Sequence, residues 1–229
     1  MINVHRRPKT RILLAATGGF IIVSILFAAV RAARLASKNL ERHNAEYVHE
    51  LELKWIDAEI TRLSSGQTSQ VHFYATSNTD LLVNRLAGMA EVRSLTFWGT
   101  DLSDNGLSII ASLPRLEKLT INGGRATDSG LEFLSQNQIL KKLHLVNLNL
   151  SNEGLVVLQS IPNLDYVTIY GGHDSRCKLT DAAGPLLSNL VRVKKMNVGG
   201  GWISKSVITA LKISLPNCEI VEDFADDEW

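Results

Sequence analysis

The chain lacks an excess of charge of either sign, because its 24 lysines and arginines are balanced by 23 aspartates and glutamates among 229 residues. This balance, together with the lack of interleaved basic and aromatic residues, gives no reason to expect nucleic acid as a partner. A phosphate-binding loop is lacking too. The glycines at Gly123-Gly124 and Gly199-Gly200-Gly201 fit neither the Walker nor the dinucleotide arrangement, and we interpret them as turn residues.

A supported catalytic or metal-binding cluster is also lacking. His173, Asp174 and Cys177 lie close together within an insertion from Gly171 to Lys178, but no second cluster supports them. A metal site needs three or four ligands that converge from fixed elements, and a nucleophilic cysteine needs a positioned base. We therefore predict that the chain is not an enzyme, that it holds no metal or cofactor, and that the insertion is a solvated loop.

What the chain does contain is a repeat. An apolar frame, L-x-x-L-x-L with other apolar residues allowed, recurs every 24 residues, with a last step of 29. Self-similarity at this period is typical of a stacked array, in which each unit buries its apolar face against its neighbours. The register extends back to Thr68, where a polar residue suits a first, capping repeat. The frames are Val92/Leu95/Phe97, Leu116/Leu119/Ile121, Leu140/Leu143/Leu145, Leu164/Val167/Ile169 and Val193/Met196/Val198.

A second column of residues supports the same period. Eleven residues after each start, allowing for the insertion, stands a serine or threonine, usually followed by Asp or Asn. Such a residue caps the first turn of a helix, and an acidic neighbour suits the positive end of the helix dipole. Each unit is therefore predicted to be a strand, a loop, a short helix and a return. The cap column consists of Ser103, Thr127, Ser151, Thr180 and Ser204.

The combination of frame and cap resembles the leucine-rich repeat superfamily. Leu116-Glu-Lys-Leu119-Thr-Ile121 followed by Thr127-Asp128-Ser129-Gly130-Leu131 is similar to its bacterial and cysteine-containing variants. The resemblance implies an α/β solenoid with parallel strands on its concave side and short helices on its convex side. It also implies a protein that binds proteins or other macromolecules.

The chain departs from that superfamily where Asn or Cys usually follows the strand. Without this polar column, the backbone inside each turn must find its hydrogen-bond partners elsewhere. We also expect Cys177 and Cys218 to be unpaired thiols, because a whole repeat separates their layers. The departing positions are Thr100, Gly124, Leu148 and Gly201.

A membrane segment is predicted near the N-terminus. Ile12 to Val30 is an uncharged run of 19 residues, long enough at about 1.5 Å per residue to cross a hydrocarbon core of roughly 30 Å. We interpret it as a single-pass signal anchor, with a cleaved signal peptide as the alternative. Four basic residues flank it on each side, so the charge count ties. The short basic tail before it favours the N-terminus inside and the repeats extracytoplasmic.

The segment from Ala36 to Leu63 is predicted to be an amphipathic stalk helix, with apolar residues that include Leu51 and Trp55 at helical spacing. Its last turns would cap the first repeat, and pairing with another copy is the alternative. The predicted organisation therefore has five parts. These are a basic tail (1–11), the anchor (12–30), the stalk and cap (31–67), the leucine-rich repeat domain (68–221) and an acidic tail (222–229).

The concave face is the candidate interaction site. Strand side chains alternate, so the residues between the frame positions point outward and bring tyrosine, tryptophan and lysine to one face. Such residues serve as anchors for a protein partner, or they merely stabilise a solvated sheet. We also expect His72 and His144 to face solvent there. The predicted partner-binding residues are Tyr74, Trp98, Lys118, Lys142, His144, Tyr166, Tyr170 and Lys195.

Three classes of function are compatible with these features. A membrane-tethered protein-interaction module agrees with the repeat, the anchor and the aromatic face. A structural envelope protein without one specific partner is the alternative. A subunit of an enzyme would require a convergent cluster around His173, Asp174 and Cys177. The partner's identity and the oligomeric state do not follow from the sequence.

Overall fold

The computed structural model describes residues 59–62, 68–75, 77–87, 89–171 and 177–222 of the chain. The predicted basic tail, membrane anchor, most of the stalk and nearly all of the acidic tail lie outside these residues. Among the residues that are described, no helix combines the length and the apolar character that a membrane crossing requires.

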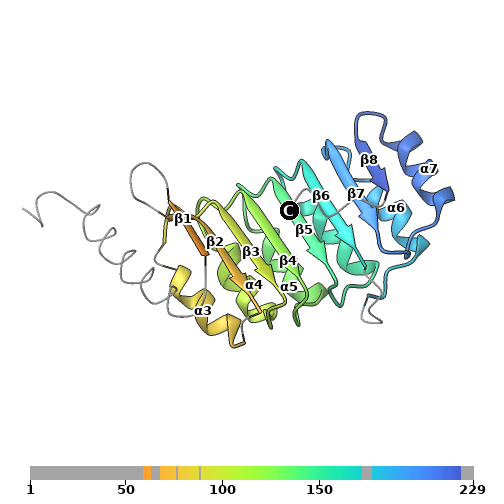
Figure 1. Cartoon of the computed structure of the whole chain (residues 1–229). Coiled ribbons are helices and arrows are strands. Elements are labelled where there is room, and N and C mark those ends of the chain that lie inside the picture. The colour runs from red at the N-terminus through yellow and green to blue at the C-terminus, as the bar shows by residue number, and fades with distance from the viewer. Residues whose placement is uncertain (1–58, 63–67, 76, 88, 172–176, 223–229) are drawn as a thin grey trace, which may run out of the picture. The chain divides into compact units, whose positions relative to one another are not determined.

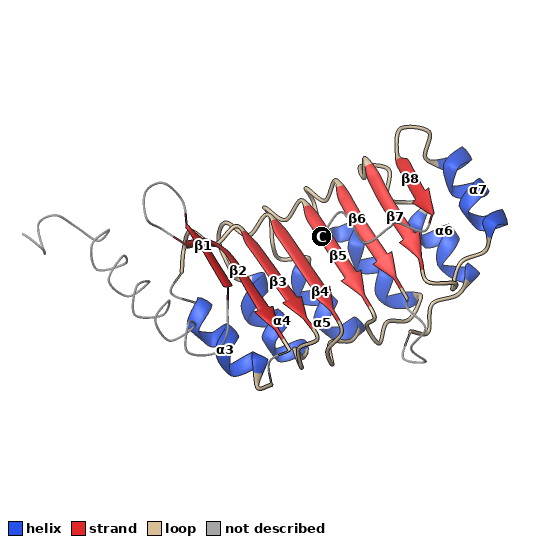
Figure 2. Ribbon diagram, in the orientation of Figure 1, coloured by secondary structure: helices blue, strands red, loops and turns tan. Residues whose placement is uncertain are grey.

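The central element is an eight-stranded sheet whose strands follow one another in chain order (Figures 1 and 2). Strands β2 to β8 are parallel, whereas β1 pairs with β2 in the antiparallel direction. The strands are β1 (Glu59–Arg62), β2 (Thr68–Tyr74), β3 (Ser94–Trp98), β4 (Lys118–Asn122), β5 (Lys142–Val146), β6 (Tyr166–Tyr170), β7 (Lys195–Gly199) and β8 (Glu219–Glu222).

The strand register confirms the predicted period. Leu95 lies opposite Leu119, Leu119 opposite Leu143, and Leu143 opposite Val167 on successive strands. These four side chains are fully buried in one continuous apolar core that runs through every described repeat. The insertion is absorbed before β7, where Val167 still pairs with the frame residue Met196.

The predicted stalk helix does not extend to the end of its segment, where the structure has strand β1 instead. Residues 59–62 form a strand that pairs with β2, and the expected helix is wrong for this stretch. The physical reason is the edge of the sheet. The first strand of a parallel stack would otherwise present a row of unpaired N–H and C=O groups, and an antiparallel strand pairs them.

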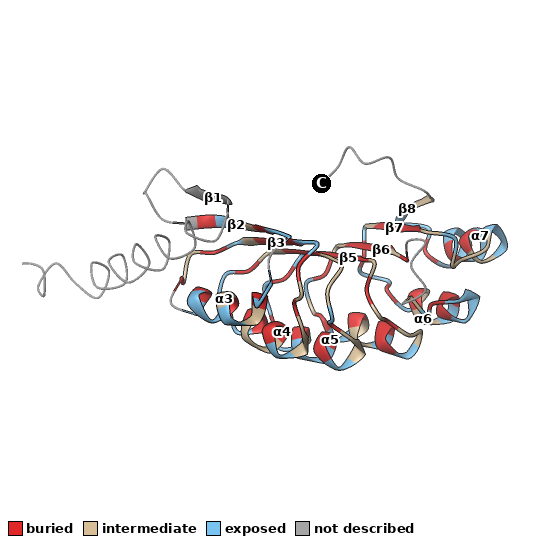
Figure 3. Ribbon diagram, turned by 60° about the horizontal axis from the view of Figure 1, so that its bottom comes forward, coloured by how far each residue is buried: buried red, intermediate tan, exposed pale blue. Residues whose placement is uncertain are grey.

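The described helices all lie against one face of the sheet, and none of them covers its other face (Figure 3). Each repeat contains the predicted helical segment, but the segment after β5 is a 3-10 helix and the segment after β6 begins as one. The segments are α3 (Thr79–Leu86), α4 (Asp104–Ala111), α5 (Asp128–Leu134), η1 (Glu153–Ser160), η2 (Asp181–Ala183), α6 (Gly184–Leu187) and α7 (Lys205–Ser214).

The Asp or Asn that follows a residue of the cap column links one repeat to the next. The carboxylate of Asp104 accepts hydrogen bonds from the backbone N–H of Thr127 at 2.7 Å and from its hydroxyl at 2.8 Å. Asp128 binds Ser151 in the same way. We expected these acidic residues to favour the dipole of their own helix, but they also hold the start of the following helix.

The glycine two residues after each of these carboxylates leaves room for the linking carboxylate of the preceding repeat. A Cβ atom on Gly106 would lie 2.5 Å from the Oδ1 atom of Asp80, which is the linking carboxylate of the preceding repeat. A Cβ atom on Gly130 would collide with Asp104 in the equivalent way. The glycine of the [ST]-[DN]-x-G-L pattern is therefore required by the approach of the neighbouring repeat.

Candidate protein-interaction face

The sheet face opposite the helices, which we call the open face, carries three rows of outward side chains. Each row crosses the strands, because equivalent residues lie opposite one another in register. The lysine row is Lys118, Lys142, Tyr166 and Lys195. The buried polar row is Thr120, His144, Thr168 and Asn197. The aromatic row is Tyr74, Trp98, Asn122, Val146 and Tyr170.

The structure places all eight predicted partner-binding residues on this face. Tyr74, Trp98 and Tyr170 lie in the aromatic row, His144 lies in the buried polar row, and the remaining four make up the lysine row. Tyr74 and Trp98 are the most accessible of the aromatic side chains, with 44% and 40% of their surface exposed. Their grouping is therefore a geometric fact, and their role as anchors stays a prediction.

Tyr166 organises the middle of the lysine row. Its hydroxyl accepts a hydrogen bond of 2.8 Å from the Nδ2 atom of Asn197 on the next strand. The Nζ atoms of Lys142 and Lys195 lie 5.9 and 5.7 Å from the centroid of its ring. Cation–π attraction at this distance holds both ammonium groups near the ring. Lys195 also lies 3.8 Å from the carboxylate of Glu219 on β8.

Lys118 and Lys142 carry the same charge on directly opposed positions of β4 and β5. Burial lowers the pKa of the Lys118 ammonium, and the positive charge of Lys142 lowers it further. Among the described residues, neither lysine forms an ion pair with a carboxylate. This end of the row is therefore a local concentration of positive charge.

His144 corrects a prediction, because it lies on the expected face but is only 3% exposed. Its Nδ1 atom is 3.0 Å from the hydroxyl oxygen of Thr168, and its ring meets the Tyr166 ring in an edge-on contact with centroids 5.0 Å apart. Burial lowers the pKa of His144 to about 3, and the charges of Lys118 and Lys142 add to this shift. The imidazole is therefore neutral at physiological pH.

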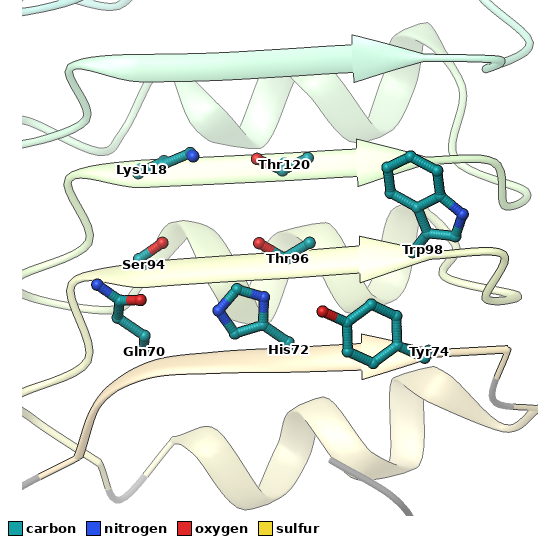
Figure 4. Close-up of a pocket in the computed structure, with 8 residues that line it drawn as sticks. All are labelled: Gln70, His72, Tyr74, Ser94, Thr96, Trp98, Lys118 and Thr120. Atoms are coloured by element: carbon teal, nitrogen blue, oxygen red, sulfur yellow. The ribbon is translucent and has the colours of Figure 1, made fainter. Parts of the chain in front are cut away.

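A hollow of about 480 Å³ lies over β2, β3 and β4 at one end of the open face. Figure 4 shows the side chains that line it, with Tyr74 and Trp98 at one end and Lys118 at the other. The prediction placed these three in the site. Strand alternation also predicted the other lining residues on this face, but they were not among the predicted partner-binding residues. They are Gln70, His72, Ser94, Thr96 and Thr120.

The described residues contain no group of three or more histidine, cysteine or acidic side chains placed to hold a metal ion. Burial raises the pKa of the Cys177 thiol, and burial together with the charge of Glu219 raises that of Cys218 to about 11. Both thiols therefore stay protonated near neutral pH. His173 and Asp174 lie outside the described residues.

No protein-family model matches the chain, and no curated protein matches its sequence. Solved structures with a similar fold include two that are described here. A pollen receptor kinase 3 is 15% identical over 71% of this chain and 76% of its own, with a TM-score of 0.43. An internalin (inlF) from Listeria monocytogenes is 15% identical over 81% of this chain and 56% of its own, with a TM-score of 0.45.

In the described repeats, parallel strands stay in register while a helical segment recurs on one side of the sheet. These features define an α/β repeat array, and they agree with the leucine-rich repeat resemblance.

Proposed function

We propose that the chain is a protein-interaction module that binds its partner on the open face of the sheet. The observation that carries this proposal is the grouping of exposed aromatic and basic side chains on the one face that the helices leave uncovered. Tyrosine and tryptophan supply large contact areas at a low entropic cost, and lysine supplies a charged surround.

A non-catalytic role is part of this proposal. The neutral, buried imidazole of His144 and the protonated thiols of Cys177 and Cys218 support it, because none of them is prepared to act as a nucleophile or a general acid. A partner surface needs no such group. It needs side chains that are fixed before the partner arrives, and Tyr166 is held in this way.

The test is to measure partner capture and thermal stability on the same variants of the full chain in a nonionic detergent. Trp98→Ala and Tyr170→Ala should each weaken binding by about 2 kcal/mol, roughly thirtyfold, with little change in melting temperature. Phe133→Ala is the matched control, because Phe133 is 36% exposed but lies on helix α5, away from the open face.

The opposite pattern would contradict the proposal. If both open-face variants melt at a lower temperature while capture is unchanged, the aromatic residues stabilise the sheet and the structural reading is correct. If Phe133→Ala weakens capture as much as Trp98→Ala does, the partner does not bind on the open face.

We further propose that Ile12 to Val30 tethers the module to a membrane, with the repeats on the extracytoplasmic side. The uncharged run and the short basic tail before it support this placement. A reporter enzyme that works only outside the cytoplasm should be active when fused after Trp229, and protease added to intact cells should cut the array. Protection of the array until the membrane is broken would reverse the orientation.

A further inference from the structure

Charges next to the open face are matched between repeats. The residue before the lysine-row position alternates in sign along the array, as Arg93, Glu117, Lys141, Asp165 and Lys194. Glu117 lies 2.7 Å from Arg93 and 3.0 Å from Lys141, and Lys194 lies 3.9 Å from Asp165. In this column each positive charge that stabilises the stack has an acidic neighbour one repeat away.

The lysine row breaks this pattern. Lys118 and Lys142 are directly opposed across β4 and β5, where like charges destabilise a sheet. None of the outward side chains on β2 to β7 is acidic, and the nearest carboxylate in the row is that of Glu219 beside Lys195 at its far end. Stability within the fold therefore does not explain the pairing of Lys118 with Lys142.

The surface between the rows is suited to an extended chain. The buried polar row forms a low floor, since Thr120, His144 and Thr168 are all nearly inaccessible. The lysine row lies on one side of this floor and the aromatic row on the other. In an extended segment that crosses the strands, successive side chains would point alternately to the two rows. The row from Lys118 to Lys195 spans three strand spacings, about 14 Å, which four to five extended residues cover.

We propose that the partner contributes an acidic, extended segment that lies across β4 to β7, with its carboxylates on the lysine row and its alternate side chains against Asn122, Val146 and Tyr170 of the aromatic row. This inference rests on the proposed function and specifies the chemistry of the partner. A carboxylate near Lys118 and Lys142 removes the repulsion between the two ammonium groups. Tyr166 already holds Lys142 and Lys195 in place, so these two side chains lose little conformational freedom on binding.

The probe is an eight-residue labelled peptide that alternates Asp with Ala, titrated by fluorescence anisotropy against the full chain in a nonionic detergent. Matched peptides carry Asn or Lys in place of Asp. The acidic peptide should bind at least tenfold more tightly than the Asn peptide, and its affinity should fall as salt is added. Equal affinity for the Asp and Asn peptides would overturn the inference.

Charge reversal on the protein locates the site. Lys142→Glu should weaken binding of the acidic peptide at least tenfold and improve binding of the Lys peptide. Lys212→Glu changes the net charge equally, but Lys212 is exposed on α7, so binding should stay within twofold. Equal effects of the two variants would show that net charge alone drives binding, against the inference. A single-stranded oligonucleotide of equal charge that binds more tightly than the peptide would also overturn it.

The same variants separate this inference from the proposed function. If natural partner capture depends on Trp98 and Tyr170 but is unchanged by Lys142→Glu and by salt, the open face binds a partner that is not acidic. The inference is then wrong and the proposed function stands. If capture is indifferent to all of these changes, both are wrong.

Discussion

His144 shows how the open face sets the chemistry of a single residue. A histidine between two frame residues was expected at the surface, yet the ring of Tyr166 packs edge-on against it and Thr168 binds its Nδ1 atom. Two lysines on the same face add positive charge to the effect of burial. The protein therefore maintains a neutral imidazole at the centre of a basic surface.

This neutral imidazole makes stability depend on pH. The folded pKa of His144 is about 3, below the ordinary value of 6.5, so the unfolded chain binds more protons between these values. Its contribution to stability is complete above about pH 6.5 and is lost as the pH falls towards 3. Between pH 6.5 and pH 5 the loss should be about 2 kcal/mol.

Chemical denaturation of the parent and of His144→Gln at several pH values measures this contribution. Glutamine keeps a polar side chain without a proton to bind, so the variant should lose the added slope between pH 6.5 and pH 5. The lowered pKa values of Asp101 and Glu117 act at lower pH, because their ordinary values are 3.8 and 4.5. Equal slopes for parent and variant in this window would contradict the neutral imidazole.

At the scale of the element, the array is joined by carboxylates that reach from one helix to the start of the next. The link from Asp104 to Thr127 satisfies a backbone N–H and a hydroxyl together. Asn152 makes the corresponding contact with Thr180 across the insertion, at 3.0 Å from the backbone N–H. The link therefore survives where the repeat is longest, and it explains why a small residue follows two positions later.

Gly130→Ala tests this packing. In an exposed helix, alanine in place of glycine stabilises by about 1 kcal/mol. Here the added methyl group would collide with the Oδ1 atom of Asp104 and lie 2.9 Å from Leu107, so we expect a loss of about 1 to 3 kcal/mol in unfolding free energy.

Two further variants give the comparison. Ser129→Ala changes an exposed neighbour in the same helix and should alter stability by less than about 0.5 kcal/mol. In the double variant Asp104→Ala with Gly130→Ala, the collision with the Oδ1 atom is gone, so the two losses should be less than additive. Strict additivity would mean that Asp104 and Gly130 do not interact.

The repeat period gave a correct prediction of the strand register, because apolar spacing alone determines which face of a strand is buried, as at Leu119 and Leu143. It did not predict β1, because a segment of four residues is too short for its apolar pattern to distinguish a helical turn from a strand. The burial of His144 was missed because it depends on a side chain from the neighbouring repeat. The links between Asp and cap residues were missed for the same reason. Contacts between repeats depend on how the units are rotated and stacked, which no single repeat encodes.

At the scale of the molecule, the described repeats share one continuous core and one continuous sheet. Each repeat contacts its neighbours through strand pairing, apolar packing and the carboxylate links. Stability in such an array is the sum of weak units and strong interfaces, so neighbouring repeats unfold together. The open face keeps its rows aligned only while this stack is intact.

Leu119→Asp should disrupt the whole stack. Leu119 is fully buried between two equally buried frame residues on adjacent strands, Leu95 and Leu143. An unpaired carboxylate there costs several kcal/mol, which is comparable with the total stability of a small domain. Ile139→Asp is the matched control, because Ile139 is 41% exposed in a turn of the next repeat and should tolerate the charge.

We expect Leu119→Asp to abolish the cooperative thermal transition seen by circular dichroism, with Ile139→Asp close to the parent. If Leu119→Asp instead melts with the parent's midpoint and cooperativity, the register and the shared core described above are both wrong.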